Sequence, residues 1–311
     1  MSLGINTKPR RKIGSATEET VVEKPIFISG LGRSGTTIIH SVLAEHSNAN
    51  WLSLFCSKYP THPEFNRWVM HAIDVPLLNI PVRRRFVPLE NYDFWNYHYR
   101  GFFRPCRDLT LADMTLQARK GIRRVFGELV TRKRNRMVIK TTGMPRIGFL
   151  HGIFPDGKFI HVIRDGRAVA HSRMNVEFWR GWEGGLLWPG ELPDEYRREW
   201  QSYDCSFVAL AGIEWKANMD VFETFKKDSP HIKVLEVRYE AFCRDPVAEI
   251  RRMAEFCELK WTDGFKKTVQ NFHVGSENDK WQKQLTEAQK DILEEVLRPY
   301  LVRYGYEVQK R

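Results

Sequence analysis

The sequence predicts an α/β fold in which a central parallel sheet is covered by helices on both faces. Two observations predict it: short apolar segments recur along the chain, and a segment with helical spacing of its apolar residues follows each of them. Such apolar segments are typical of strands buried on both sides, and strands that alternate with helices form parallel sheets. Three layers follow, and ligands are expected at the carboxyl ends of the strands.

Four strands are expected, each followed by a helix. The strands are at 25–28, 137–140, 158–164 and 233–238. The helices are expected from about 38, within 145–154, at 167–174 and after Asp245-Pro246. A last helix at about 286–304 begins with a capping box, in which Thr286 is followed three residues later by Gln289.

The chain divides into a tail and one expected domain. Residues 1–24 are polar and charged, which predicts a disordered tail, and 25–311 are expected to form a single domain. Two stretches interrupt the alternation, 51–110 and 176–203. Long insertions at the active edge of a sheet usually carry function, so both are expected to bind substrate there. The second contains four tryptophans that either contact the acceptor or fill a subsidiary core: Trp179, Trp182, Trp188 and Trp200.

Composition limits the class of protein. The 311 residues carry a formal net charge of +11, which favours an anionic partner such as a nucleotide, a nucleic acid, a membrane surface or a sulfated product. Five cysteines show no CxxC pair and no metal-ligand spacing, so a disulfide framework is not expected and a cytoplasmic location is. No apolar run approaches the roughly 18 residues of a membrane helix, and no signal peptide is recognisable.

A glycine-rich turn joins the first strand to its helix. Gly30 and Gly35 have the spacing of the common nucleotide loop, but Thr36 stands where the lysine that reaches the β- and γ-phosphates belongs. The cation is instead Arg33. The backbone N–H groups of such a turn and the helix N-terminus attract an anion. The turn therefore predicts a P-loop-type phosphate site that lacks the usual partner of a metal-bound triphosphate.

A second anion site is expected downstream. Arg164 ends the strand at 158–164, and Ser172 lies about two helical turns along the next helix. An arginine at a strand end and a serine on the following helix can hold one phosphate together. The competing interpretation takes Asp165 as the metal-binding aspartate of an NTPase, which the missing loop lysine disfavours.

At this point the sequence resembles the family of sulfotransferases that use 3′-phosphoadenosine 5′-phosphosulfate (PAPS). The segment 30–37 is similar to the family's 5′-phosphosulfate loop, and 164–172 to its 3′-phosphate motif, in wording closest to the tyrosylprotein sulfotransferases and related bacterial enzymes. Weaker similarities extend over most of 25–305. They are Lys140 before a helix, the segment 237–240 with Asp245-Pro246, and Lys280-Trp281 with Leu285-Thr286.

The resemblance implies a role for each matching position. The loop residues Gly32, Arg33, Ser34, Gly35, Thr36 and Thr37 would hold the 5′-phosphate and the sulfate. Arg164 and Ser172 would hold the 3′-phosphate, and Tyr239 would lie near the adenine. Lys280 and Trp281 would close over the nucleotide.

The implied chemistry is in-line sulfuryl transfer, which requires no metal. Fixed positive groups stabilise the charge that grows on the leaving phosphate oxygen, and the candidates are Arg33 and Lys140. A general base must reach the acceptor hydroxyl or amine. The tyrosylprotein enzymes have a glutamate shortly after the loop's helix, which this chain lacks. The candidate is Glu90, in a segment that resembles the Pro-x-Glu of many bacterial sulfotransferases, and the second is His62.

Two other functions stay open on sequence grounds. One is a kinase or other nucleotide enzyme that uses ATP and Mg²⁺. The other is a nucleic-acid-binding protein, suggested by the basic runs at 83–85 and 131–136, although these match no recognition module. The second run is expected to be a solvated loop or part of a site for an anionic acceptor. The acceptor itself is a small molecule, glycan, lipid or peptide, and the assembly a monomer or homodimer.

Overall fold

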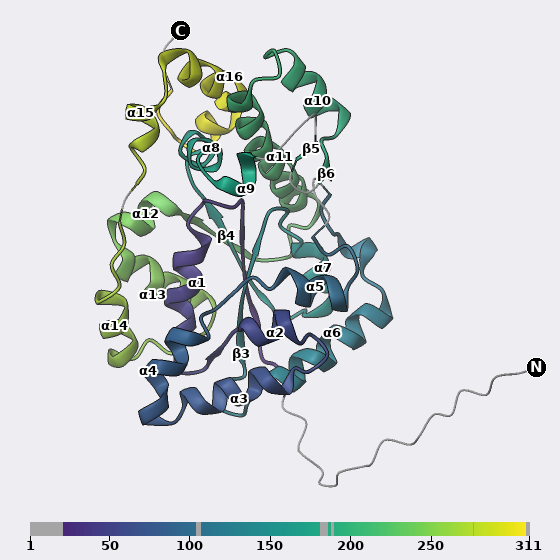
Figure 1. Ribbon diagram of the computed structural model, residues 1–311, viewed down its shortest axis with the longest axis vertical. Coiled ribbons are helices and arrows are strands. Elements are labelled where there is room, and N and C mark those ends of the chain that lie inside the picture. The colour runs from purple at the N-terminus through teal and green to yellow at the C-terminus, as the bar shows by residue number, and fades with distance from the viewer. Residues whose placement is uncertain (1–20, 104–106, 181–185, 188–189, 276, 309–311) are drawn as a thin grey trace, which may run out of the picture.

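The computed structural model describes residues 21–103, 107–180, 186–187, 190–275 and 277–308 (Figure 1). Its centre is a five-stranded parallel sheet in the order β2-β3-β1-β4-β7. The strands are β1 Ile26–Gly30, β2 Ala49–Asn50, β3 Arg136–Thr142, β4 Lys158–Ile163 and β7 Val234–Arg238. The sequence predicts four of them, and these are confirmed; it misses β2, which has only two residues and therefore no readable pattern.

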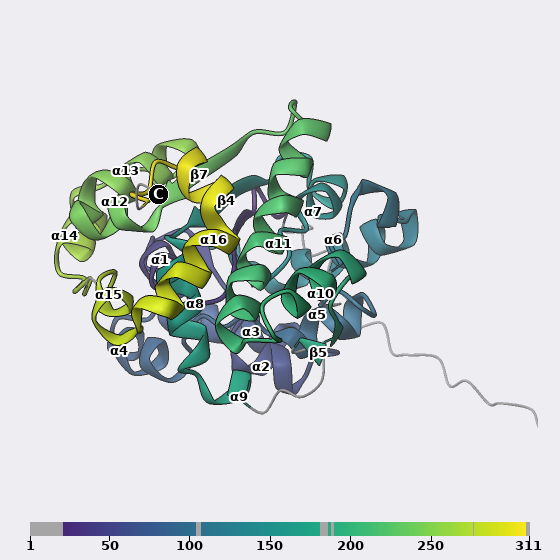
Figure 2. The same ribbon diagram turned by 90° about the horizontal axis from the view of Figure 1, so that it is seen from above.

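Two apolar cores lie on opposite faces of the sheet. In β1, Phe27 belongs to one core while Ile26 and Ile28 belong to the other, as alternation along a strand requires. Seen from above in Figure 2, α12, α13 and α14 lie on one side of the sheet, and α6 and α7 lie on the other. This is the expected three-layer α/β arrangement.

Helices fill the outer layers and the loops. Those that follow or precede the central strands are α1 Thr36–Ala44, α6 Leu116–Leu129, α7 Ile147–Ile153, α8 Gly166–Met174, α11 Phe207–Asp228, α12 Tyr239–Arg244, α13 Pro246–Phe256, α14 Asp263–Gln270, α15 Lys280–Gln284 and α16 Glu287–Arg303. The predicted capping box is confirmed at α16, where Thr286 and Gln289 bond each other's backbone N–H. In the described residues, no helix combines the length and apolar character that a membrane crossing requires.

The stretch 51–110 divides between the two ends of the sheet. It forms α2 Leu54–Lys58, α3 Glu64–Ile73, α4 Pro76–Arg85 and α5 Tyr92–His98, and the short 3₁₀ helix η1 Leu111–Asp113 follows it. In Figure 1, α3 and α4 lie at the bottom, opposite α8 and α9. Glu90 instead meets Thr142, at the carboxyl end of β3. Tyr92, the first residue of α5, also contacts Thr142, so the segment that contains Glu90 and the start of α5 reaches the edge where ligands are expected.

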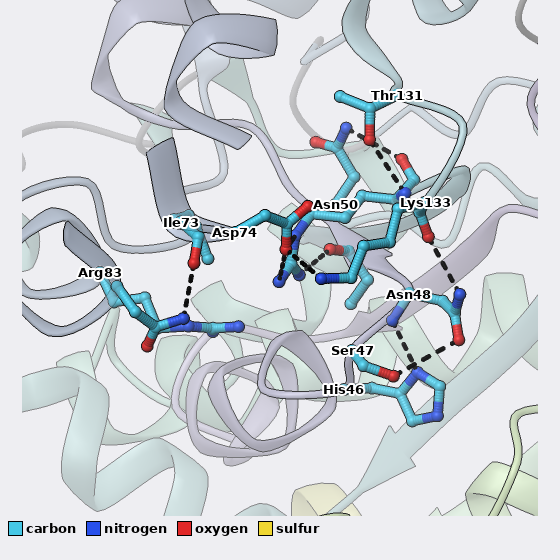
Figure 3. A network of polar contacts seen from close by, with 12 residues as sticks. His46, Ser47, Asn48, Asn50, Ile73, Asp74, Arg83, Thr131 and Lys133 are labelled. Atoms are coloured by element: carbon cyan, nitrogen blue, oxygen red, sulfur yellow. Dashed lines mark hydrogen bonds and ion pairs between the residues drawn. The ribbon is translucent and has the colours of Figure 1, made fainter. Parts of the chain in front are cut away.

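Polar contacts attach α3 and α4 to the amino end of the sheet (Figure 3). Asp74, which ends α3, accepts hydrogen bonds from the buried Arg134 at 2.8 Å and from Lys133 at 2.8 Å. Arg136 is also buried and donates to the carbonyls of residues 24, 257 and 258. The run 131–136 was expected to be a solvated loop or an anion site, and this is wrong for Arg134 and Arg136, whose guanidinium groups bond within the protein.

The stretch 176–203 packs partly into the core. It contains α9 Glu177–Arg180, a small antiparallel pair of β5 Leu186–Leu187 and β6 Gly190–Glu191, and α10 Asp194–Gln201. Trp179 and Trp200 are buried in the main apolar core, so they fill a core and do not face an acceptor. Trp182 and Trp188 lie outside the described residues.

The expected tail is shorter than the sequence indicates. Residues 1–20 lie outside the described residues. Residues 21–24, also assigned to the tail, contact the body: Val22 is buried, Glu23 N–H donates to Asn135 O at 3.2 Å, and Lys24 N–H donates to Asp156 at 2.8 Å.

Candidate active site

The glycine turn between β1 and α1 contains left-handed backbone conformations. Arg33 and Gly35 have φ of 79° and 89°, in the left-handed region. Gly35 also precedes the first residue of α1 and has no side chain to cap that helix. A Cβ on Gly35 would lie 2.2 Å from the ring of Tyr239, so this position requires glycine for space as well as for φ. Successive N–H groups in such a turn form a concave anion site.

The loop's hydroxyls differ in exposure. Ser34 and Thr36 are buried, while Thr37 is exposed on the first turn of α1. Thr37 Oγ1 accepts a hydrogen bond from Lys140 Nζ at 2.9 Å. The loop is thereby linked to β3, the neighbouring strand.

The residues expected to hold a second phosphate lie together. Arg33 Nε donates to Ser172 Oγ at 2.9 Å, and Arg164 Nη1 donates to the Arg33 carbonyl at 2.9 Å. Arg164 is buried, and its other hydrogen bonds go to Asn278 Oδ1 and the Glu277 carbonyl, both at 3.0 Å. All three acceptors are neutral oxygens. A buried guanidinium held by neutral partners fits an anionic ligand, because the ligand would supply the missing negative charge.

Tyr239 forms the floor between these two parts. It begins α12, directly after β7, and its ring lies against Gly35. The Arg164 guanidinium lies 4.8 Å from the centre of the same ring. Gly35, Tyr239 and Arg164, which are expected to surround one nucleotide, therefore lie against one another in the protein itself.

Lys280 and Trp281, the two residues expected to close over the nucleotide, lie in different surroundings. Lys280 pairs with Glu277 at 2.7 Å, in the same segment that contacts Arg164. Trp281 packs in the main core with Arg167 4.4 Å above its ring. Only 8% of Trp281 is exposed, which leaves little of the ring for a ligand.

A carboxylate and an ammonium meet at the carboxyl end of β3. Glu90 Oε2 lies 3.4 Å from Lys140 Nζ, and the side chains of both are about nine-tenths buried. Glu90 Oε1 accepts the backbone N–H of Thr142 at 2.5 Å. The Lys140 ammonium thus lies between Glu90 and Thr37, so that a potential base, a cation and the phosphate loop contact one another in that order.

Tyr92 is a member of this cluster that sequence reasoning missed. Its hydroxyl donates to Glu90 Oε2 at 2.9 Å and lies 3.0 Å from Thr142 Oγ1. Burial, and then the negative charge of Glu90, raise the pKa of Tyr92, so the hydroxyl stays protonated and remains a donor. The one sequence feature that could have identified Tyr92 is its position two residues after the candidate base Glu90.

Arg173 is a second residue that the sequence did not single out. It is buried on α8, and Glu214 of α11 binds its Nε at 2.7 Å and also its Nη2. Its remaining Nη1 lies 3.2 Å from the place of a Cβ on Gly32. Gly32 therefore lets a fixed cation approach the loop closely, and adjacency to Ser172 was the only sequence signal.

His62 lies on the surface before α3. Its side chain is 52% exposed, its Nδ1 lies 2.9 Å from Glu64, and its ring stacks on Phe65. These contacts are with the start of α3, whereas Glu90 contacts β3. The structure thus brings Glu90, but not His62, into the cluster with Lys140.

Comparison with known proteins places this geometry in context. The model of the sulfotransferase family matches residues 25–263. The sequence is 23% identical to omega-hydroxy-beta-dihydromenaquinone-9 sulfotransferase Stf3 of Mycobacterium bovis and of Mycobacterium tuberculosis, over 94% of this chain and 78% of theirs.

Solved structures show the same fold. Sulfotransferase STF9 from Mycobacterium avium aligns with a TM-score of 0.54 and 16% identity, over 93% of this chain and 79% of its own. The sulfotransferase domain from the curacin biosynthetic pathway aligns with a TM-score of 0.53 and 14% identity, over 93% of this chain and 100% of its own.

Proposed function

This chain belongs to the sulfotransferase family. We propose that it transfers the sulfuryl group of PAPS in line to a hydroxyl or amine, with Glu90 as general base and without a metal. The observation that carries the proposal is the series of contacts from the mostly buried Glu90 through the mostly buried Lys140 to the exposed Thr37 of the phosphate loop. It puts a proton acceptor beside the cation that a departing phosphate needs.

Each residue in this series of contacts has a separate task in the proposed step. Glu90 takes the acceptor's proton while the acceptor oxygen or nitrogen bonds to sulfur, and the bond from sulfur to the 5′-phosphate oxygen breaks. Lys140, with Arg33 and the loop N–H groups, stabilises the negative charge left on 3′-phosphoadenosine 5′-phosphate. Tyr92 and the Thr142 N–H hold the Glu90 carboxylate in place.

The proposed nucleotide site rests on the groups that surround Tyr239. Arg164 and Ser172 are assigned the 3′-phosphate, and the neutral partners of Arg164 support this. Tyr239 is assigned the adenine side. We keep Lys280 as a contact of the nucleotide and give Trp281 a supporting role, because it is buried under Arg167.

For the acceptor, a small hydroxyl-bearing, lipid-like molecule is favoured over a glycan or a peptide. The support is the name of the Stf3 relatives, which specifies a hydroxylated menaquinone. We also propose a cytoplasmic location, supported by the free state of the four described cysteines Cys56, Cys205, Cys243 and Cys257.

The test separates this function from that of a kinase. Calorimetry should show binding of 3′-phosphoadenosine 5′-phosphate in preference to ATP with Mg²⁺, and ³⁵S-labelled PAPS should label an acceptor from a panel of lipid alcohols, phenols, glycans and peptides. Transfer should persist in EDTA. Preference for ATP with Mg²⁺ would contradict the nucleotide site, and labelling that requires a divalent metal would contradict the proposed mechanism alone.

A further inference from the structure

The hairpin formed by α3 and α4 exposes an unusual amount of apolar surface. None of the residues of α4 is buried. Leu77 is 90% exposed and Ile80 61%, and Trp68 on α3 is 62% exposed. Val75 and Leu78 are also exposed. Scattered apolar residues on a surface are normal, but a cluster on two consecutive helices indicates an interaction site.

This exposure does not arise from a loosely attached hairpin. Asp74, at the corner between the helices, binds Arg134 and Lys133 (Figure 3). Asn79 Nδ2 donates to the Ile73 carbonyl at 2.7 Å, and Arg83 binds Glu45 at 3.1 Å at the end of α1. Polar contacts therefore attach the corner of the hairpin and the end of α4 to the body of the protein, while Leu77 and Ile80 stay exposed.

The same helix ends in positive charge. Its sequence is PLLNIPVRRR, with three arginines in its last turn and no acidic residue. Arg83 faces inward to Glu45, whereas Arg84 and Arg85 are exposed. Apolar side chains thus occupy the first turns of α4 and cations its end.

An apolar groove lies beside the hairpin. It has a volume of about 470 Å³, and its walls come from α2, α3, α4 and the residue after α4. Aromatic rings dominate the lining: Phe55, Tyr59, Phe65, Trp68 and Phe86. Trp68 belongs both to this groove and to the exposed apolar surface, so the two are continuous at that ring.

We propose that the α3–α4 hairpin is a docking surface for an anionic lipid bilayer. Leu77 and Ile80 enter the boundary between headgroups and acyl chains, and Arg84 and Arg85 bind lipid phosphates. Exposed tryptophan is favoured at such an interface, and basic side chains beside an apolar surface bind anionic headgroups. The charge of the whole chain, +11, acts in the same direction.

Charge complementarity decides for a bilayer against other partners. A nucleic acid would pair with the arginines but would leave the leucine and isoleucine in water. A second copy of this chain packed against α4 would cover the apolar side chains, but its own α4 contains no acidic residue to pair with the arginines. An anionic bilayer satisfies both parts of the helix at once.

The experiment is cosedimentation with phosphatidylcholine vesicles that contain or lack phosphatidylglycerol. Wild-type protein should bind the anionic vesicles and lose affinity as salt is raised. Arg84→Gln with Arg85→Gln should weaken binding about thirtyfold, since each arginine near an anionic surface contributes roughly a factor of five. Leu77→Ser with Ile80→Ser should weaken it at least about tenfold.

Matched variants isolate this face of the molecule. Leu116→Ser changes a leucine of α6 that is 71% exposed, between Ile80 and Leu77, and Arg124→Gln with Arg251→Gln removes two exposed arginines elsewhere. Both should bind vesicles as the wild type does, and near-UV circular dichroism should show that every variant is folded. Equal losses in these controls, or binding unchanged in the Leu77/Ile80 variant, would overturn the proposal. So would a concentration-dependent dimer that the Leu77/Ile80 variant dissociates, because a second copy would then cover the surface.

Discussion

The carboxylate of Glu90 lies 3.4 Å from the ammonium of Lys140, although one residue precedes α5 and the other is in β3. Two opposite charges that are both mostly buried stabilise each other only if further hydrogen bonds complete the cluster. Here Thr142 N–H and Tyr92 serve Glu90, and Thr37 serves Lys140. The cluster is thus held in place beside the phosphate loop, which is the positioning that the proposed catalytic roles of the two residues need.

Glu90→Gln should lower kcat at least about a hundredfold and leave the affinity for 3′-phosphoadenosine 5′-phosphate unchanged, because a general base acts on the chemical step. Steady-state kinetics and calorimetry measure the two quantities. His62→Gln and Glu64→Gln, at the exposed pair before α3, serve as controls and should keep wild-type turnover. Loss of activity in His62→Gln with retention in Glu90→Gln would reverse the assignment.

Lys140→Met should lower kcat by about a hundred- to a thousandfold, since it removes a fixed charge from the leaving group. The measurement is kcat at saturating PAPS. Lys216→Met removes a partly buried lysine that pairs with Glu199 at 2.8 Å, and it should cost stability without this loss of turnover. A Lys140→Met enzyme with normal kcat would show that the leaving phosphate is stabilised elsewhere.

Arg164→Met should weaken the binding of 3′-phosphoadenosine 5′-phosphate by about ten- to a hundredfold, the usual effect of losing charge-assisted hydrogen bonds. The same variant should bind adenosine 5′-phosphate, which lacks the 3′-phosphate, nearly as well as the wild type does. Calorimetry with both ligands gives the comparison. An equal loss for the two nucleotides would mean that Arg164 does not recognise the 3′-phosphate.

Gly35→Ala should destabilise the fold and abolish nucleotide binding. The backbone at this position has a φ of 89°, which alanine rarely adopts, and the new Cβ would lie 2.2 Å from the Tyr239 ring. Gly121→Ala is the matched control: it lies inside α6 with no atom within 4 Å of the added Cβ. Alanine there should stabilise the protein by about 0.5–1 kcal/mol. Urea unfolding measures both, and a Gly35→Ala protein as stable as the wild type would contradict the close approach of Tyr239.

His40 should make the protein sensitive to acid. Burial lowers its pKa to about 3, with a further contribution from the charge of Lys140. Because the native pKa lies below the ordinary 6.5, the unfolded chain binds the proton first, and stability falls as pH falls from 6.5 toward 3. The slope from this one group is about 1.4 kcal/mol per pH unit. His40→Gln, whose amide N–H can still donate to the Val138 carbonyl, should flatten the curve by that amount in urea unfolding. Parallel curves for the two proteins would exclude this role.

Some parts of the site follow from local sequence. The turn from Gly30 to Gly35 can be predicted because only glycine accepts its backbone geometry at Gly35, and because a strand and a helix flank it. The capping box at Thr286 follows from the residue types alone. The proximity of Arg164 and Ser172, which both bond Arg33, required one more step, the recognition that a strand end and the next helix meet at one edge.

Other parts depend on contacts between distant segments. The role expected of Trp281 over the nucleotide conflicts with its burial under Arg167, which no local pattern reveals. The run 131–136 reads as solvated, yet Asp74 and backbone carbonyls take up Arg134 and Arg136. A charged sequence does not specify whether its partner is water or another segment of the chain.

The contact between Glu90 and Lys140 separates what local sequence can predict from what depends on the packing of distant segments. Four strands of the sheet, the phosphate loop and the residue types of a base and a cation can be inferred from the amino acids alone, because these depend on short-range backbone preferences and on the chemistry of single side chains. The folded chain was needed to show that Glu90 and not His62 joins Lys140, that Tyr92 and Arg173 lie beside the predicted residues, and that α4 exposes its apolar residues. Those outcomes depend on which buried charges and surfaces meet when distant segments pack together.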